Sequence, residues 1–251
     1  MDSLRLEKLT KRFGGLEAVR DLTIAFERSR ITGLIGPNGA GKTTIVNMIT
    51  GIIPPTDGEI LLGERSLTRI EPYEAARLGI SRTFQNVRLL TEASVLDNIV
   101  IGFHSHQKSS LLANSIGLPL VWRERREFRA RAYALIERFG MTELADRSAG
   151  ALSYGHRRLV EVMRALALAP SFVLLDEPCA GMNDVESRKL GLIIRELAEE
   201  GIGIVLVEHN MRFVMEFCDH IFVVDSGRLI AQGQPDAVRN DANVIRAYLG
   251  D

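Results

Sequence analysis

The chain has 251 residues, enough for one substantial domain or two small ones. Its 46% hydrophobic and 25% charged residues are typical of a globular protein and argue against disordered, collagen-like and low-complexity architectures. The 31 basic and 32 acidic side chains nearly cancel, so no overall basic field favours nucleic acid, and no apolar stretch is long enough to span a bilayer.

The N-terminal part of the chain predicts β-structure, then a glycine-rich loop and a helix. Apolar residues alternate with mostly polar ones in the two earliest segments, the period of half-buried strands. A continuous apolar run then indicates a buried strand ending in glycine. The pattern predicts strands around residues 4–6, 22–26, 31–35 and 59–62, a helix over about 42–50 and a turn at 54–58.

Helical periodicity dominates from about residue 87 to 168, with helices expected over Arg123–Phe139 and Tyr154–Leu168. Continuous apolar runs then return, as expected of parallel strands covered on both faces. These strands are expected at residues 172–175, 203–207 and 221–224, with a helix over about 185–197. The order indicates an α/β core interrupted by a helical insertion.

A phosphate-binding loop follows the first buried strand and opens the first helix. The segment Gly36-Pro37-Asn38-Gly39-Ala40-Gly41-Lys42-Thr43 matches G-x-x-x-x-G-K-[ST] at every fixed position. Glycines let successive N–H groups face phosphate oxygens, Lys42 brings charge to the β- and γ-phosphates, and the Thr43 hydroxyl is placed to bind Mg²⁺. Thr44, the next residue, is included in the predicted nucleotide site. The context favours this interpretation over a chance glycine-rich turn.

Two acidic residues follow the buried strand at 172–175. The strand brings Asp176 to the carboxyl edge of the sheet, where it can hold Mg²⁺ directly or through water. Glu177 comes next and is placed to orient or deprotonate an attacking water. The alternative is a helix N-cap or a solvated pair at a strand end, which the upstream phosphate loop makes less favourable.

Three further motifs appear in order: Gln85 after Phe84, the signature segment Leu152–His156, and His209 within Val207–Met211. With the two motifs above, the chain resembles the nucleotide-binding subunit of an ATP-binding-cassette (ABC) transporter over essentially its whole length. The resemblance implies an α/β P-loop NTPase fold with a mixed sheet, an antiparallel β subdomain and a helical subdomain. It divides the single domain, 1–251, into an ATP-binding core (1–86 and 169–251) and a helical part (87–168).

The resemblance also implies roles for individual residues. Phe13 resembles the aromatic residue that stacks on adenine. Gln85 resembles the glutamine that reaches Mg²⁺ and the γ-phosphate and links them to the membrane subunit. Ser153 and Gly155 resemble the residues that contact the γ-phosphate bound on the opposite subunit, and His209 resembles the histidine that contacts the γ-phosphate and positions the water.

The signature segment also has a physical interpretation of its own. A hydroxyl and a bare backbone at a helix N-terminus form an anion site, and a second anion site in one chain suggests a two-fold sandwich around two ATP molecules. The alternatives are that Ser153 is a plain N-cap and that His209 is a satisfied histidine. The segment departs from the family at Tyr154, usually glycine, and at His156, usually glutamine; Asn183 stands where aspartate is usual.

Within the family, the chain most resembles importers of branched-chain amino acids. The features that carry this resemblance are residues 152–155, 179–183 and 208–211, the insertion at about 102–130 and the ending at 247–250. Related systems carry urea and amides, and the substrate never touches this subunit. The implied partners are transmembrane permeases, a second ATP-binding subunit (identical or related) and, indirectly, an extracytoplasmic substrate-binding protein, with no nucleic acid. The implied location is the cytoplasmic face of the membrane, and the implied cofactors are ATP and Mg²⁺.

Other interpretations remain open at this stage. One is an ATPase of the same superfamily that acts in DNA repair or on ribosomes, although the chain has neither sustained heptads nor a second cassette. A GTPase would need an Asn-Lys-x-Asp base reader, which the sequence lacks. The stretch 123–138, with six arginines and three glutamates, is interpreted as a solvated helical face rather than a membrane-surface element.

Overall fold

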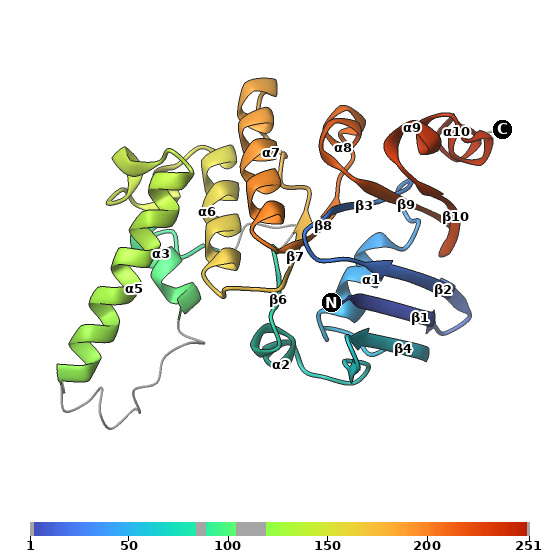
Figure 1. Cartoon of the computed structure of the whole chain (residues 1–251), viewed down its shortest axis with the longest axis horizontal. Helices are drawn as coiled ribbons and strands as arrows, with labels where there is room; N and C mark the ends of the chain where they lie inside the picture. The colour runs from blue at the N-terminus through green and yellow to red at the C-terminus, as the bar shows by residue number, and fades with distance from the viewer. Residues whose placement is uncertain (1–2, 84–88, 104–118, 250–251) are drawn as a thin grey trace.

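The computed structural model describes residues 3–83, 89–103 and 119–249, and two β-sheets organise this part of the chain (Figure 1). A six-stranded sheet has the order β10-β9-β3-β8-β7-β6, in which β10 alone is antiparallel to its neighbour. Its strands are β3 (Ile31–Ile35), β6 (Ile80–Arg82), β7 (Phe172–Asp176), β8 (Gly203–Val207), β9 (His220–Asp225) and β10 (Arg228–Gly233).

A four-stranded antiparallel sheet has the order β2-β1-β4-β5. Its strands are β1 (Leu4–Phe13), β2 (Leu16–Phe26), β4 (Asp57–Leu62) and β5 (Arg65–Ser66). The described helices are α1 (Lys42–Ile49), α2 (Pro72–Arg77), α3 (Val95–Gly102), α5 (Pro119–Arg138), α6 (Tyr154–Leu166), α7 (Asp184–Glu199), α8 (Met211–Phe217), α9 (Pro235–Arg239) and α10 (Ala242–Leu249), with short 3₁₀ turns at Thr142–Leu144 and Ala149–Ala151.

The central strands are buried because each separates two apolar clusters. Along β7, Phe172 and Leu174 join the cluster that includes the antiparallel sheet and α1, whereas Val173 and Leu175 join the cluster of α3, α5, α6 and α7. The two-residue period of a strand sends neighbouring side chains to opposite faces, so both faces must be covered. The helical segments on the left of Figure 1 therefore share one apolar core with the six-stranded sheet.

A bulge in β1 explains why its apolar pattern changes phase. Leu4, Leu6 and Leu9 are all buried, although strict alternation would place Leu9 on the opposite face from the first two. The register with β2 shifts between Leu6 and Leu9, and the intervening Lys8 has a φ of 48°. The extra residue thus returns Leu9 to the core side of the sheet.

The structure confirms the predicted helices and buried strands, with small differences at their ends. The Arg-rich helix begins earlier than expected, at Pro119, and ends at Arg138. Helix α6 ends at Leu166, before the predicted end, because Ala169 adopts a left-handed φ of 48° and Pro170 follows it. The sequence analysis did not predict α2, β5, β6, α8, β10, α9 or α10, and it gave no bounds for α3 within the region expected to be helical.

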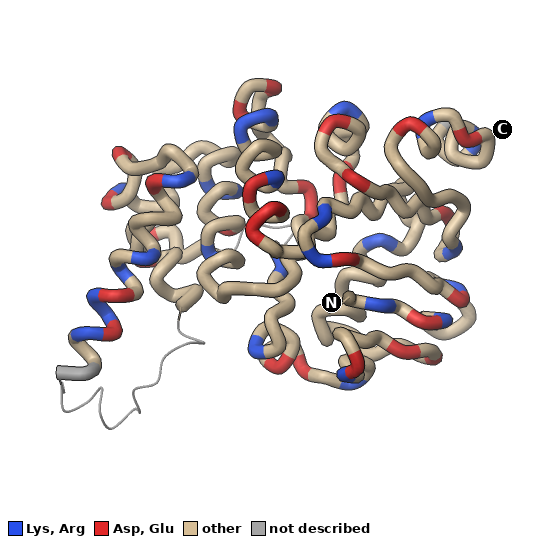
Figure 2. The backbone as a smooth tube through the Cα atoms, viewed as in Figure 1, with Lys and Arg blue, Asp and Glu red and all other residues tan. Residues whose placement is uncertain are grey.

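Charges of both signs alternate along α5 (Figure 2). Within the helix Arg131 pairs with Glu127 at 3.9 Å, and across to α3 Arg129 pairs with Asp97 at 3.0 Å. Such exposed pairs contribute at most about 1 kcal/mol each to stability. The helix thus has the solvated, paired charges expected of its sequence. In the part of the chain that the structure describes, no helix is long and apolar enough to cross a membrane.

Gly203 leaves no room for a side chain between β7 and β8. A Cβ there would lie 2.3 Å from Cε1 of the fully buried Phe172, its register partner on β7, and 3.0 Å from the carbonyl oxygen of Glu27. We expect Gly203→Ala to lower the free energy of unfolding by about 1–3 kcal/mol, the usual cost of overpacking. Urea unfolding at an unchanged m value would measure this loss.

Gly15→Ala is the matched control, because a Cβ at Gly15 meets nothing within 4 Å and its φ is not left-handed. A Gly203→Ala midpoint equal to that of this control would contradict the packing argument.

Candidate functional site

The phosphate loop lies between β3 and α1, at the carboxyl edge of the six-stranded sheet. Its three glycines, Gly36, Gly39 and Gly41, have φ values of 152°, 81° and 100°. A side chain at Gly36 would place Cβ 1.9 Å from the carbonyl oxygen of Val224 on β9. The curled loop predicted from the sequence therefore depends on glycine for both its backbone angles and its contact with β9.

The turn between β9 and β10 supports the loop from the other side. The N–H of Gly227 donates a hydrogen bond to the carbonyl oxygen of Ala40 at 3.0 Å. A Cβ at Gly227 would lie 2.7 Å from the carbonyl oxygen of Ala18 on β2, and one at Gly41 would lie 2.5 Å from the same oxygen. The loop is thus held between β2 and the β9–β10 turn.

Lys42 points into the loop that it follows. Its Nζ donates to the carbonyl oxygens of Gly36 at 2.7 Å and Pro37 at 2.9 Å, and only 7% of the residue is exposed. Burial lowers the pKa of Lys42, while the nearby carboxylates of Glu177 and Asp176 oppose that shift. The lysine therefore lies near both acids identified from the sequence.

Asp176 is the last residue of β7, as predicted, and it is almost fully buried. Its Oδ2 lies 3.6 Å from Nη2 of Arg82 and accepts no hydrogen bond from the residues that the structure describes. Burial raises the pKa of Asp176, and Arg82 acts against this rise. A buried carboxylate oxygen with no donor among the described residues, at the phosphate-binding edge of the sheet, fits a hard oxygen-seeking cation such as Mg²⁺.

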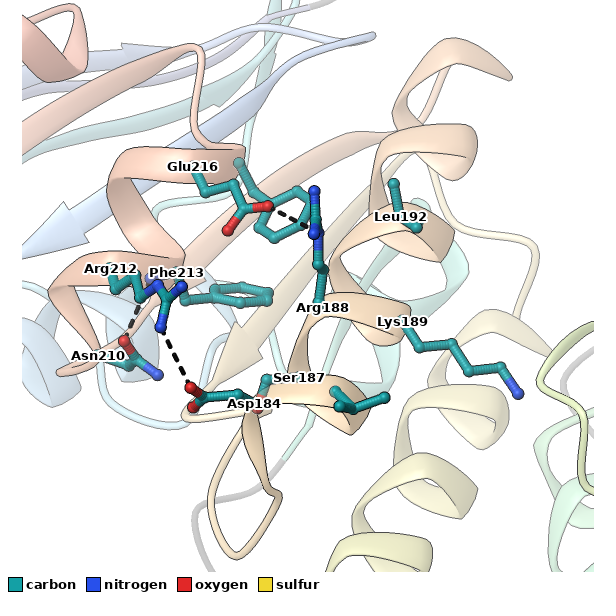
Figure 3. Close-up of a pocket in the computed structure, with 11 residues that line it drawn as sticks. Asp184, Ser187, Arg188, Lys189, Leu192, Asn210, Arg212, Phe213 and Glu216 are labelled. Carbon is teal, nitrogen blue, oxygen red and sulfur yellow. Dashed lines mark hydrogen bonds and ion pairs between the residues drawn. The ribbon is translucent and has the colours of Figure 1, made fainter.

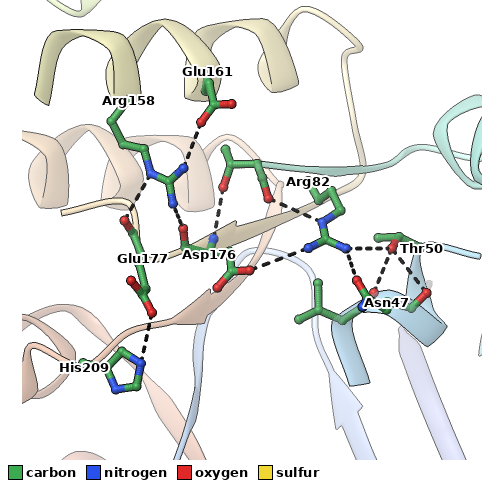
Figure 4. Close-up of polar contacts among 10 residues, drawn as sticks. Asn47, Thr50, Arg82, Arg158, Glu161, Asp176, Glu177 and His209 are labelled. Atoms are coloured by element: carbon green, nitrogen blue, oxygen red, sulfur yellow. Dashed lines mark hydrogen bonds and ion pairs between the residues drawn. The ribbon is translucent and has the colours of Figure 1, made fainter. Parts of the chain in front are cut away.

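Arg82 holds this region together from β6 (Figure 4). Its Nη1 donates to Oδ1 of Asn47 at 2.6 Å, which joins α1 to the strand beside β7. The hydroxyl of Thr83 accepts the N–H of Asp176 at 3.0 Å. The sequence analysis did not identify Arg82, because only the sheet order β8-β7-β6 brings it to Asp176.

Glu177 and His209, the two residues predicted to organise the attacking water, lie in contact. Oε1 of Glu177 lies 3.0 Å from Nε2 of His209, at the ends of the neighbouring strands β7 and β8. The two side chains are 29% and 44% exposed, so water has access to both. A carboxylate and an imidazole in contact beside a phosphate loop can orient and deprotonate a water molecule.

The sequence analysis did not identify Glu208, whose carboxylate holds the backbone close to both Glu177 and His209. Its carboxylate is buried and accepts the N–H groups of Cys179 at 3.0 Å, His209 at 2.9 Å and Asn210 at 3.2 Å. It therefore joins the segment after Glu177 to the segment that carries His209. The sequence offers one signal for Glu208, which directly follows the apolar run of a strand and directly precedes His209.

The signature segment begins α6, as predicted. The Ser153 hydroxyl accepts the N–H of His156 at 3.2 Å, so Ser153 is an N-cap in this structure. Gly155 is buried, and a Cβ there would lie 3.3 Å from Cγ of Met182. The ring of Tyr154 lies so close to Gly181 that a Cβ on this glycine would be 2.6 Å from Tyr154 Cδ1. The tyrosine thus packs on the loop that leads into α7.

Asn183 ends that loop and starts α7. Its side chain accepts the N–H of Glu186 at 3.0 Å, and the Glu186 carboxylate accepts the N–H of Asn183 at 2.9 Å. This capping box satisfies two N–H groups that helix formation leaves unpaired, and asparagine serves it as well as aspartate does. The departure at position 183 therefore leaves the helix start intact.

The two predicted anion sites are at the starts of two helices, α1 and α6, that lie apart in the structure. Helix α6 contributes to the apolar cluster on one face of the six-stranded sheet and α1 to the cluster on its other face, and the two helices lie on opposite sides of β7 in Figure 1. Phe13, at the end of β1, is 48% exposed and has the Lys11 ammonium group 5.1 Å from its ring centroid. Gln85 lies outside the residues that the structure describes.

A groove between α7 and α8 lies beside this site (Figure 3). Two ion pairs cross it, Arg212 with Asp184 at 3.1 Å and Arg188 with Glu216 at 3.1 Å. Its volume is about 590 Å³, and it includes Asn210 but none of the predicted site residues. The groove is therefore separate from the phosphate site.

Both cysteines are buried, and burial raises the pKa of each thiol, that of Cys218 to about 12. Because the thiolate is the reactive form, we expect neither Cys179 nor Cys218 to react with iodoacetamide at pH 8 in the folded chain. Mass spectrometry should find both alkylated after unfolding in urea. Rapid alkylation of the native chain would contradict their placement.

A phosphate loop, an acidic pair at the end of a buried strand and a histidine just after the adjoining strand define an ATPase of the P-loop class. Residues 19–180 match the family described as ABC transporter, and residues 228–251 match that described as branched-chain amino acid ATP-binding cassette transporter. The chain belongs to the ATP-binding subunits of the ABC transporter family, which hydrolyse ATP.

Two relatives are similar over nearly the whole chain, each aligned over 99% of this chain and 98% of the relative. One is the high-affinity branched-chain amino acid transport ATP-binding protein LivG of Salmonella typhimurium, at 41% identity. The other is the corresponding protein BraF of Pseudomonas aeruginosa, at 40% identity. The solved ADP conformation of MJ1267, an ATP-binding cassette, is 33% identical with a TM-score of 0.87 and full coverage of both chains.

Proposed function

We propose that this chain powers the import of branched-chain amino acids by binding and hydrolysing ATP. The observation that carries hydrolysis is the contact between Glu177 and His209 beside the phosphate loop. The amino-acid class is supported by the match of residues 228–251 to the branched-chain family and by the names of LivG and BraF.

ATP binding begins with an exchange of partners at Lys42. The ammonium group leaves the carbonyl oxygens of Gly36 and Pro37 for the β- and γ-phosphates, while loop N–H groups and the start of α1 face the remaining phosphate oxygens. Phe13 offers an exposed aromatic face on which adenine can stack. Thr43 and Asp176 would hold Mg²⁺, which supplies positive charge to the phosphate oxygens when bound.

The second half of the ATP site comes from another cassette. Within one chain α1 and α6 pack on opposite faces of the six-stranded sheet. The signature segment at the start of α6 would therefore contact the ATP held by the phosphate loop of a partner chain, and not the ATP of its own chain. The Ser153 hydroxyl accepts one capping bond and still has its proton to donate to a γ-phosphate oxygen. A two-fold pair would thus bury two ATP molecules between identical or closely related seams.

Hydrolysis removes the group that joins the two cassettes. Glu177 takes the proton of the attacking water, and His209 orients Glu177 and the γ-phosphate. Separation of the cassettes then moves transmembrane permeases docked on the cytoplasmic side, with Gln85 proposed as part of the link.

Uptake of radiolabelled leucine in cells that lack the gene tests the substrate class. Wild-type chain should restore uptake, and Glu177→Gln should not. Restored uptake of urea but not of leucine would favour the urea and amide relatives. Co-purification of the tagged chain with ribosomes or DNA, and not with permeases, would favour an ATPase acting on nucleic acid and contradict the proposal.

A further inference from the structure

A fully buried arginine contacts the backbone on both sides of Glu177 (Figure 4). Arg158 lies on α6, and its Nη1 donates to Oε2 of Glu161 at 2.8 Å. Its Nε donates to the carbonyl oxygen of Glu177 at 3.2 Å, and its Nη2 donates to the carbonyl oxygen of Asp176. One guanidinium group therefore reaches the two peptide groups that flank the Cα atom of Glu177.

Those two peptide groups determine where the Glu177 side chain points. Glu177 has a φ of 50°, a left-handed conformation that is unfavourable for any residue with a Cβ. Its N–H donates to the carbonyl oxygen of Val207 at 2.8 Å, which ties it to β8. The Arg158 fork fixes the carbonyl groups before and after this strained residue, and the carboxylate then meets His209.

A purely stabilising role explains this arrangement poorly. The ion pair between Arg158 and Glu161 is 0% and 1% exposed, and desolvation of such buried pairs often offsets their attraction. Apolar side chains of similar size would avoid that cost but would leave the carbonyl oxygens of Asp176 and Glu177 without this donor. What an arginine adds here is a planar fork that can hold two carbonyl oxygens at once.

We propose that Arg158 is a positioning residue for ATP hydrolysis, which holds the backbone of Glu177 and so couples the orientation of α6 to the direction of the catalytic carboxylate. Because α6 begins at Ser153, a shift of this helix when the signature segment meets the partner's ATP is transmitted to Glu177. This inference rests on the proposed roles of Glu177 and Ser153.

Arg158→Lys tests the inference in the full-length chain. The ammonium group keeps the charge that balances Glu161, but it cannot replace a planar fork on two carbonyl oxygens. We expect kcat to fall about 10- to 100-fold, the scale of a small misplacement of a catalytic group, with KM for ATP within about threefold of wild type.

Arg164→Lys is the matched control. Arg164 lies on the same helix and pairs with the same glutamate, at 3.9 Å. We expect its kcat and KM to remain close to wild type. Equal loss of kcat in both variants would overturn the inference, because it would assign the effect to the shared ion pair.

A second variant removes the charge without leaving Glu161 unpaired. In Arg158→Met/Glu161→Met, the carbonyl oxygens of Asp176 and Glu177 lose this donor, so we expect a lower thermal midpoint in a chain that stays folded at the assay temperature, with the heat of MgATP binding near wild type and kcat reduced as in Arg158→Lys. Wild-type kcat in either folded variant would overturn the inference. If the wild-type chain itself failed to hydrolyse ATP, the proposed function would fail first, so the two failures are distinguishable.

Discussion

Replacing Glu177 with glutamine should reduce ATP turnover by about 10²–10⁴-fold, the range attributed to a general base, while ATP remains bound. The amide keeps the size of the carboxylate and can still contact His209, whose Nε2 is 3.0 Å away in the native pair, but it cannot take a proton from water. Release of labelled phosphate under saturating MgATP measures turnover, and filter binding of labelled ATP measures retention of nucleotide.

Glu199→Gln provides the control, since Glu199 is exposed near the end of α7, away from the sheet edge. Its turnover should equal that of wild type. If Glu177→Gln kept more than about a tenth of wild-type turnover, the general-base assignment would be wrong.

Replacing Lys42 with methionine should weaken ATP binding by about 100-fold or more. Methionine approximates the length of the side chain but has no charge, so the charge-assisted bonds to the phosphates, worth about 1.5–3 kcal/mol each, are lost. A 100-fold weaker Kd corresponds to about 2.7 kcal/mol. Titration calorimetry with a slowly hydrolysed ATP analogue measures the difference.

Lys189→Met is the control, because it removes an exposed lysine on α7. It should leave the Kd for the ATP analogue unchanged. The thermal midpoint of Lys42→Met checks that the chain stays folded, because the buried carbonyl oxygen of Gly36 loses its donor. An unchanged Kd in Lys42→Met would place the phosphates elsewhere.

The sequence predicts most of the site because its parts are local. The phosphate loop is a continuous segment, and Asp176 and Glu177 follow an apolar run whose strand ends at Asp176, so a single strand places both acids. The apolar runs at Ile31–Ile35 and Gly203–Val207 correspond to strands β3 and β8. Local periodicity and strand length are sufficient for such elements.

The supporting residues could not be predicted, because they depend on contacts between distant segments. Arg82 and Asp176 meet only because β6 pairs with β7, and Arg158 reaches Glu177 only because α6 packs against that strand. The missed elements are short, and several carry too few residues for a helical period to be recognised. The change in the pattern of buried residues at Lys8 could not be predicted either, because a β-bulge breaks the two-residue alternation of the strand.

The central claim is that ATP is held between two cassettes, and the mass of Glu177→Gln in solution tests it most directly. Sedimentation equilibrium with MgATP should give twice the 27.8 kDa of one chain, and the same sample without nucleotide should give one chain. Adding Lys42→Met should abolish the dimer. A single-chain mass for Glu177→Gln at saturating MgATP would contradict the account.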